Sequence, residues 1–253
     1  MVKYYNHFCR LARAPFRDYD RKMNMLPLLG PLGPRDALAF GLLVLAWAGI
    51  GWLIEHPPAS RTSVSVLMTD YRREWMRQFV TRQPRIFDAN VIDSLRQGTA
   101  FFASATMIAI GGGIALIGNS DRLVGLAQDL TLTAEALVIE IKVIVVLLFV
   151  ANAFLKFVWA HRLFGYCAIL MASVPNDADD PLAFTRAAQA AEINITAARS
   201  FNRGLRAVYF ALGALAWLLG PEALMLATLA TTTVTARREF ASDSREVMLG
   251  RGS

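Results

Sequence analysis

The stretch LVIEIKVIVVLLFVANAFLKFVW, residues 137–159, decides the class of this protein. It is apolar apart from Glu140, Lys142, Asn152 and Lys156. About 20 mostly apolar residues in a helix are enough to cross the roughly 30 Å hydrocarbon core of a membrane. The stretch therefore predicts a transmembrane helix in an all-α integral membrane protein.

Apolar segments elsewhere in the chain predict the other helices of a membrane bundle. Residues 37–54 and 98–118 contain no ionisable side chain. Residues 205–236 would form one helix about 48 Å long. Gly220-Pro221 divides this segment, because proline cannot donate a backbone hydrogen bond and disfavours helix at the residue before it. We therefore expect five spans, with a four-span bundle as the alternative, over residues 37–54, 98–118, 137–159, 205–219 and 222–236.

The composition fits one membrane domain and excludes several other classes. Charged residues make up 18% of the 253 residues, whereas soluble domains contain about 25%. Cys9 and Cys167 form no CxxC pair, so neither a disulfide framework nor a zinc site is predicted. We place the membrane domain over residues 36–241, between tails at 1–35 and 242–253, and expect no cofactor.

The net charge of +6 is best explained by membrane orientation. Basic residues cluster beside the apolar spans, as they do where Lys and Arg are kept on the cytoplasmic side, so we expect no nucleic-acid partner. Residues 119–136 contain one basic residue, Arg122, against three acidic residues, and this loop should face outward. Residues 55–97 and 160–204 then lie inside, and we expect a multi-pass protein of the cell inner membrane.

The N-terminal tail conflicts with this orientation. Residues 1–35 contain seven basic residues and yet would lie outside. After Met23 or Met25, Arg35 is the one basic residue before the first span, so we expect the protein made in cells to begin at one of these methionines. No apolar region with a small-residue cleavage site precedes residue 35, and no cleaved signal peptide is expected.

Two lysines lie inside the stretch at 137–159, where ionisable side chains are costly and point to function. Lys142 and Lys156 are 14 residues apart, which places them within about 40° on one helix face, with Asn152 nearby. The polar stripe could line a permeation path. Each lysine is also within about one turn of an end of the span, where its stem can reach water, and we favour that interpretation.

Residues 64–79 predict an amphipathic helix on the cytoplasmic side. One face collects apolar and aromatic side chains at three- and four-residue steps, namely Val64, Leu67, Met68, Tyr71, Trp75 and Phe79. Such a helix suits an interface with anionic lipid or packing across the ends of the spans, and both interpretations stay open.

Small residues and histidines give weaker signals. Ala105, Ala109 and Gly113 recur at four-residue intervals, which lets two helices approach closely in a dimer seam or within one protomer. His56 and His161 both lie at inner ends of spans, but nothing in the sequence supplies the surrounding groups that a haem site needs. No catalytic triad or paired carboxylates stand out, so we expect no enzyme activity.

Several short stretches form a recognisable pattern. They are Arg72-Arg73-Glu74-Trp75-Met76, Ile92-Asp93-Ser94-Leu95-Arg96, Phe101-Phe102-Ala103-Ser104, Phe154-Leu155-Lys156-Phe157, Tyr166-Cys167-Ala168-Ile169, Phe201-Asn202-Arg203-Gly204-Leu205-Arg206 and Arg237-Arg238-Glu239-Phe240. Together they make residues 37–241 resemble a family of bacterial and plant membrane proteins, domain of unknown function 599. The resemblance implies a polytopic helical membrane protein and brings no biochemical activity with it.

In the expected topology most of these stretches lie on the inner face. Guanidinium groups suit phosphate and carboxylate, so a cytoplasmic-side site for lipid headgroups or a partner protein is predicted, with anchoring of the spans as the alternative role for Arg72, Arg73, Trp75, Arg96 and Arg203. The leading hypothesis is a non-enzymatic scaffold or accessory protein that binds partners, a second copy of itself or anionic lipid through this face. The second is a small transporter or channel that uses the lysine stripe.

Overall fold

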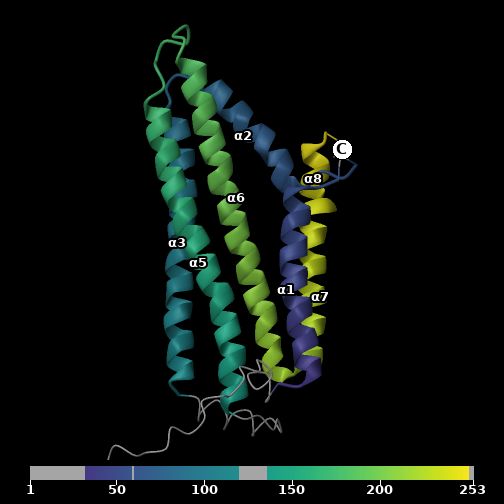
Figure 1. The fold of residues 1–253 in the computed structure, drawn as a ribbon. Helices are drawn as coiled ribbons and strands as arrows, with labels where there is room; N and C mark the ends of the chain where they lie inside the picture. The colour runs from purple at the N-terminus through teal and green to yellow at the C-terminus, as the bar shows by residue number, and fades with distance from the viewer. Residues whose placement is uncertain (1–31, 59, 120–135, 251–253) are drawn as a thin grey trace, which may run out of the picture.

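The computed structural model describes residues 32–58, 60–119 and 136–250, and within them the chain is helical with no strand (Figure 1). The prediction of an all-α chain is confirmed. The proposed start sites Met23 and Met25, the tail at 1–31 and most of the expected outer loop lie outside the described residues. The elements are α1 (Pro34–Glu55), α2 (Val64–Thr81), α3 (Ile86–Ile117), α5 (Ala136–Ala172), α6 (Ala183–Leu215), the 3-10 turn η2 (Ala216–Leu219), α7 (Pro221–Phe240) and α8 (Asp243–Met248).

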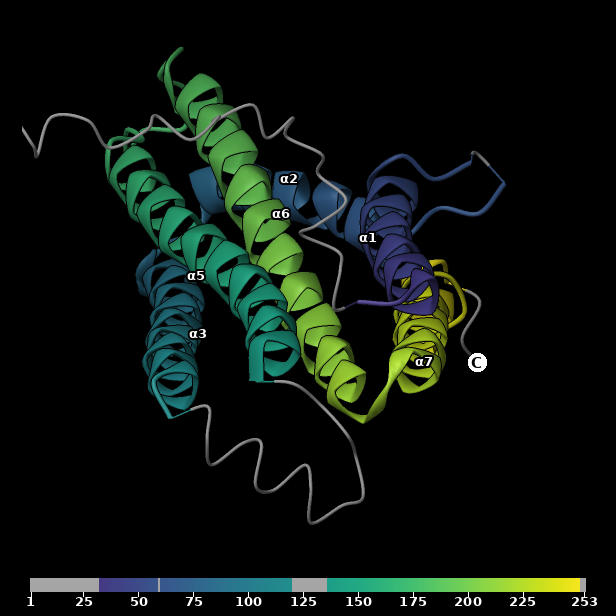
Figure 2. The same ribbon diagram turned by 60° about the horizontal axis from the view of Figure 1, so that its bottom comes forward.

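The long helices form an elongated bundle with two distinct ends. Seen along the bundle, α3, α5 and α6 form a row, and α1 and α7 form a pair beside α6 (Figure 2). α2 crosses one end of the bundle, where α8 and the turn at 173–182 also lie (Figure 1). We call this the α2 end, and we call the opposite end, where α6 turns into α7, the Gly220 end.

Among the described residues, three helices are long and apolar enough to cross a membrane by length and composition: Pro34–Glu55, Ile86–Ile117 and Leu137–Ala172. α5 has 37 residues, a length of about 55 Å, which exceeds the roughly 30 Å hydrocarbon core. α6 is also longer than the expected span at 205–219, because it begins at Ala183 and runs unbroken through residue 204 to Leu215. The ring of Phe157 packs against Gly204, which leaves room there for a close helix contact.

The turn between α6 and α7 lies at the Gly220-Pro221 step. Gly220 has φ 130°, a conformation that side chains with a Cβ rarely adopt, and Pro221 starts α7 at a position where its missing N–H is not needed. α6 and α7 then run antiparallel and in contact (Figure 1).

α2 is held against the bundle by both apolar and polar contacts. Met76, Phe79 and Val80 are buried in a cluster with residues of α5 and α6. At the corner into α3, Arg85 donates hydrogen bonds to the carbonyls of Val80, Val174 and Pro175. The structure thus shows packing across the bundle end, although Tyr71 from the predicted apolar face is 51% exposed.

Candidate functional site

A polar cavity of about 310 Å³ lies at the α2 end, where α1, α2, α6 and α7 meet. Its polar lining comes from segments as far apart in sequence as Glu55 and Glu239. Three arginines and two glutamates face it, together with smaller polar groups: Arg72, Arg199, Arg206, Glu55, Glu239, Ser65, Thr69 and Asn202. We call this space the basic cavity.

Both carboxylates of the basic cavity are already held by hydrogen bonds. Glu55, at the end of α1, accepts from Arg203 Nε at 2.8 Å and from Arg206 Nη2 at 2.6 Å. Glu239, near the end of α7, accepts from the backbone N–H and the hydroxyl of Ser65, both at 3.0 Å. These bonds join α1 to α6 and α2 to α7, so the carboxylates fix the walls of the cavity.

Among the described residues, the guanidinium groups of Arg72 and Arg199 are not paired with a carboxylate. Arg72 donates to Asn194 Oδ1, and the Asn194 amide in turn donates to Cys167 Sγ at 3.5 Å. Burial lowers the pKa of the Arg72 guanidinium, but an arginine remains charged in a protein. Neither Arg72 nor Arg199 forms an ion pair within the part of the chain that the structure describes. With three arginines against Glu55 and Glu239, the lining keeps a net positive charge, and Arg72 and Arg199 can donate to an anion.

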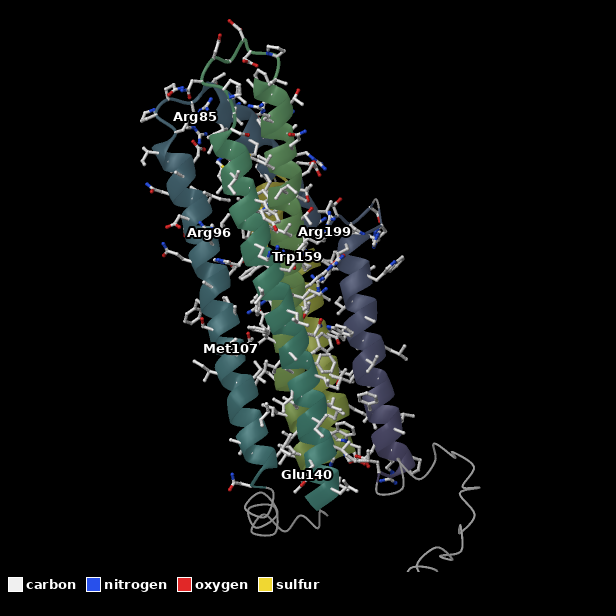
Figure 3. The ribbon with its side chains drawn as sticks, turned by 60° about the vertical axis from the view of Figure 1, so that its left-hand side comes forward. Arg85, Arg96, Met107, Glu140, Trp159 and Arg199 are labelled. Carbon is white, nitrogen blue, oxygen red and sulfur yellow. The ribbon has the colours of Figure 1, made fainter. Side chains whose placement is uncertain are left out.

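The depth of the basic cavity can be read along α5. Trp159 and Arg199 lie at a similar level toward the α2 end, with Glu140 at the other end of the same helix (Figure 3). The 19 residues from Glu140 to Trp159 correspond to about 28 Å of helix, close to the thickness of the hydrocarbon core. Trp159 is half exposed and stacks with Arg162 at 5.7 Å, an arrangement typical of the membrane–water interface. The basic cavity and Glu140 are thus separated along the bundle by about the thickness of a hydrocarbon core.

The structure separates the other residues that we predicted for an inner-face site. Arg73 points away from the cavity and pairs with Glu192 at 2.8 Å and with Asp70 at 3.3 Å. These carboxylates raise the pKa of Arg73. Trp75 donates to Asp88 Oδ1 at 2.7 Å at the α2–α3 corner.

Arg96 and Arg203 also lie outside the cavity lining. Arg96 lies on α3 beside Arg162 and Tyr166 in a shallow hollow. Arg203 does not line the basic cavity but holds Glu55. Arg72 is thus the one residue of the predicted set that lines the cavity, and Arg203 supports it.

The lysine stripe on α5 is not a continuous polar path. Lys142 does not reach toward water as we expected, because its side chain is 10% exposed. Its Nζ lies 4.0 Å from Asp36 Oδ1 and 5.8 Å from the centroid of the Trp217 ring. Asn152 and Lys156 are half-buried farther along α5. Lys142 and Lys156 are about 21 Å apart along the helix, with the buried Phe149 and Ala153 between them.

The described residues contain no cluster of side chains suited to a metal ion, and the two histidines weighed for haem lie apart in separate contacts. Within them, no group of three or more His, Cys, Asp or Glu side chains could hold a metal ion. His56 stacks on Trp52, while His161 Nδ1 lies 3.3 Å from Thr99 Oγ1 and from the Arg96 carbonyl. The two histidines are therefore engaged in separate local contacts.

The helical bundle and its apolar helices are compatible with a membrane protein. Residues 38–244 match the family model described as "Protein of unknown function, DUF599", and the chain belongs to this family. The family resemblance seen in the sequence is thereby confirmed. Neither a curated protein nor a solved structure matches the chain.

Three of the stretches that carry the resemblance converge on the basic cavity. They contribute Arg72, then Asn202 and Arg206, and finally Glu239. Sequence reasoning missed Glu55 and Arg199, because both lie outside the quoted stretches. It also missed the role of Glu239, because its partner Ser65 lies on a different helix. Arg206 and Glu239 could have been proposed as site residues, because both lie in the stretches that carry the family resemblance.

Proposed function

We propose that this protein is a multi-pass protein of the cell inner membrane that crosses five times and binds the phosphate of an anionic lipid headgroup in the basic cavity. The α2 end faces the cytoplasm, where the positive-inside rule places loops rich in basic residues. The three apolar helices supply α1, α3 and α5 as spans. α6 and α7 supply the other two.

Two of the five threonines of α7 have hydroxyl groups bonded within the helix, which supports α7 as a span. Thr232 donates to the Thr228 carbonyl at 2.7 Å and Thr235 donates to the Thr231 carbonyl at 2.8 Å. Hydroxyl groups bonded within their own helix need no water. α7 also has 20 residues, about 30 Å of helix, and lies along α1 over that length (Figure 1).

The second half of α6 reaches the same depth as the start of α1. Trp217 in η2 donates to Asp36 Oδ1 at 2.7 Å, and Asp36 is in the first turn of α1. α6 is therefore opposite the full length of α1. Arg206, its one charged residue in this half, is neutralised by Glu55 at 2.6 Å.

One observation carries the anion-binding proposal: Arg72 and Arg199 face a cavity whose carboxylates are already bonded to other groups. A phosphate accepts hydrogen bonds from guanidinium groups in a planar, two-point geometry. Basic pockets between helices on the cytoplasmic side recognise anionic headgroups in this way. In the proposed placement the cavity lies at the depth of the lipid headgroups, which favours a lipid over a soluble anion.

The test is photo-crosslinking in vesicles of phosphatidylcholine that contain the full-length protein. The probe is phosphatidylglycerol with a photoreactive group on its headgroup, and the labelled peptides are mapped. We expect labelling of residues 64–81 and 194–206, with unlabelled phosphatidylglycerol competing about tenfold better than phosphatidylcholine, since hydrogen bonds to charged groups contribute about 1.5–3 kcal/mol.

The matched variants decide whether the cavity is responsible. Arg72→Gln with Arg199→Gln should remove the preference for phosphatidylglycerol at these peptides. Arg77→Gln is the control, because Arg77 is an exposed arginine of the same helix that pairs with Glu74 and lies outside the cavity. A preference that survives the double substitution, or one that Arg77→Gln also removes, would show that general surface charge and not the cavity attracts the lipid.

A further inference from the structure

A second cavity is an apolar groove on a different part of the bundle. It has a volume of about 950 Å³ and lies between α3, α5 and α6, in the half toward the Gly220 end. Its walls include the small residues Ala105, Ala109 and Gly112. Cavities of this size that combine apolar walls with a few polar groups are typical ligand sites.

Two polar side chains line this groove. The hydroxyl of Thr106 is within 2.8 Å of the Phe102 carbonyl of its own helix, so Thr106 needs no ligand. Lys142 is the other, and it carries the one charge of the lining. Within the described residues it pairs with Asp36 at 4.0 Å, the outer limit of an ion pair. Asp36 is meanwhile bonded to the indole of Trp217.

The groove has the length of one membrane leaflet. On α5 its lining extends from Ile139 to Val150, about 16 Å of helix, which is half of the roughly 30 Å hydrocarbon core. Lys142 is near one end of this length, beside Leu218 and Leu219 of η2. The charge therefore lies toward the Gly220 end, and the apolar walls extend from there toward the middle of the bundle.

We propose that this groove binds one acyl chain of an anionic membrane lipid from the leaflet at the Gly220 end, with the lipid phosphate next to the Lys142 ammonium. The positive charge of Lys142 suits the phosphate, and the length of the groove suits an acyl chain that spans one leaflet. The inference rests on the membrane placement proposed above but not on the basic cavity, which lies at the opposite end of the bundle.

The test uses phosphatidylglycerol with a photoreactive group on an acyl chain, in phosphatidylcholine vesicles that contain the full-length protein. We expect labelling concentrated on residues 101–116 and 208–219. Unlabelled phosphatidylglycerol should compete about tenfold better than phosphatidylcholine, as a charge-assisted contact predicts. Labelling spread evenly over all the long helices would overturn the proposal.

A groove-filling variant tests the acyl chain separately from the charge. Ala109→Phe places a ring inside the groove and should reduce labelling about tenfold, whereas Ala115→Phe should not, because Ala115 is exposed on the same helix and does not line the groove. Lys142→Gln should keep the labelling but remove the preference for phosphatidylglycerol. Unchanged labelling in Ala109→Phe, or crosslinks between two copies of the chain through α3, would overturn the proposal.

The labelling experiments distinguish a failure of the groove proposal from a failure of the proposed function at the basic cavity. The double variant Arg72→Gln, Arg199→Gln should retain full labelling of the groove. Extraction of the protein from vesicles by alkali would overturn the membrane placement and both proposals together.

Discussion

The two ends of the bundle use charge in opposite ways. At the α2 end, carboxylates join helices that are distant in sequence, as when Glu55 holds Arg203 and Arg206. At the Gly220 end, Arg35 and Glu222 form an exposed pair at 3.4 Å, and Lys142 lies beside Asp36 at 4.0 Å. Ion pairs with buried partners thus join helices at the α2 end, whereas the Gly220 end has an exposed pair, a long pair and the hydrogen bond from Trp217 to Asp36.

This contrast has a physical cause. Exposed ion pairs contribute little to stability because water and salt screen them. A buried charge that loses its partner destabilises a protein strongly. Arg206 has a side chain that is 9% exposed, and that of Arg35 is 80% exposed. Equivalent substitutions at the two ends should therefore differ widely in effect.

The largest effect is expected for Glu55→Gln. It leaves the buried guanidinium of Arg206 without its carboxylate and should lower the free energy of unfolding by about 3 kcal/mol. Glu222→Gln removes an exposed carboxylate at the Gly220 end and should change it by less than about 0.5 kcal/mol. Unfolding of the purified protein in mixed detergent micelles measures both, and equal effects would remove the contrast between the ends.

A smaller effect is expected for Gly204→Ala, where the two halves meet. A Cβ there would lie 2.7 Å from Phe157 Cε1, and the Phe157 ring is confined by Phe102 and Phe201 at 5.3 and 5.4 Å between centroids. Overpacking of this kind destabilises by about 1–3 kcal/mol. Gly111→Ala meets open space and should not lower the thermal unfolding temperature in detergent. A stable Gly204→Ala protein would mean that α5 and α6 can separate at this crossing.

The smallest effect is expected for Trp75→Phe at the α2–α3 corner. The substitution removes the 2.7 Å hydrogen bond to Asp88 but leaves the ion pair of Asp88 with Arg82. We expect a loss of about 1.5 kcal/mol, as for a hydrogen bond to a charged group. Trp52→Phe, on the exposed face of α1, is the matched control and should show no loss. Proteolysis near residues 82–85 reports whether the corner loosens.

Sequence reasoning reached the features that depend on local composition. The apolar stretches at 37–54 and 137–159 fall within α1 and α5, and the stretch at 98–118 ends one residue beyond α3. The turn at Gly220-Pro221 could also be predicted, because proline acts on its own position and on the residue before it. The continuity of α6 was harder to predict, because the contact between Gly204 and Phe157 that accompanies it depends on packing with α5.

The basic cavity could not be assembled from the sequence for a related reason. Its partners are set by which helices lie side by side: Glu55 and Arg206 are 151 residues apart, and Ser65 and Glu239 are 174 apart. No spacing rule connects such residues. Lys142 shows the same limit, because its neighbours Asp36 and Trp217 come from α1 and η2. From the sequence, Lys142 was expected to reach water because it lies near the end of a span.

In the proposed arrangement the two ends of the bundle lie on opposite sides of the membrane, and thiol labelling in bacterial spheroplasts distinguishes the two sides. Single cysteines replace the exposed Asn176 at the α2 end or Glu222 at the Gly220 end, in a protein with Cys9→Ser and the fully buried Cys167 retained. We predict that a membrane-impermeant maleimide labels Glu222→Cys in intact spheroplasts and labels Asn176→Cys after permeabilisation. Labelling of both positions in intact spheroplasts would contradict the five-span arrangement.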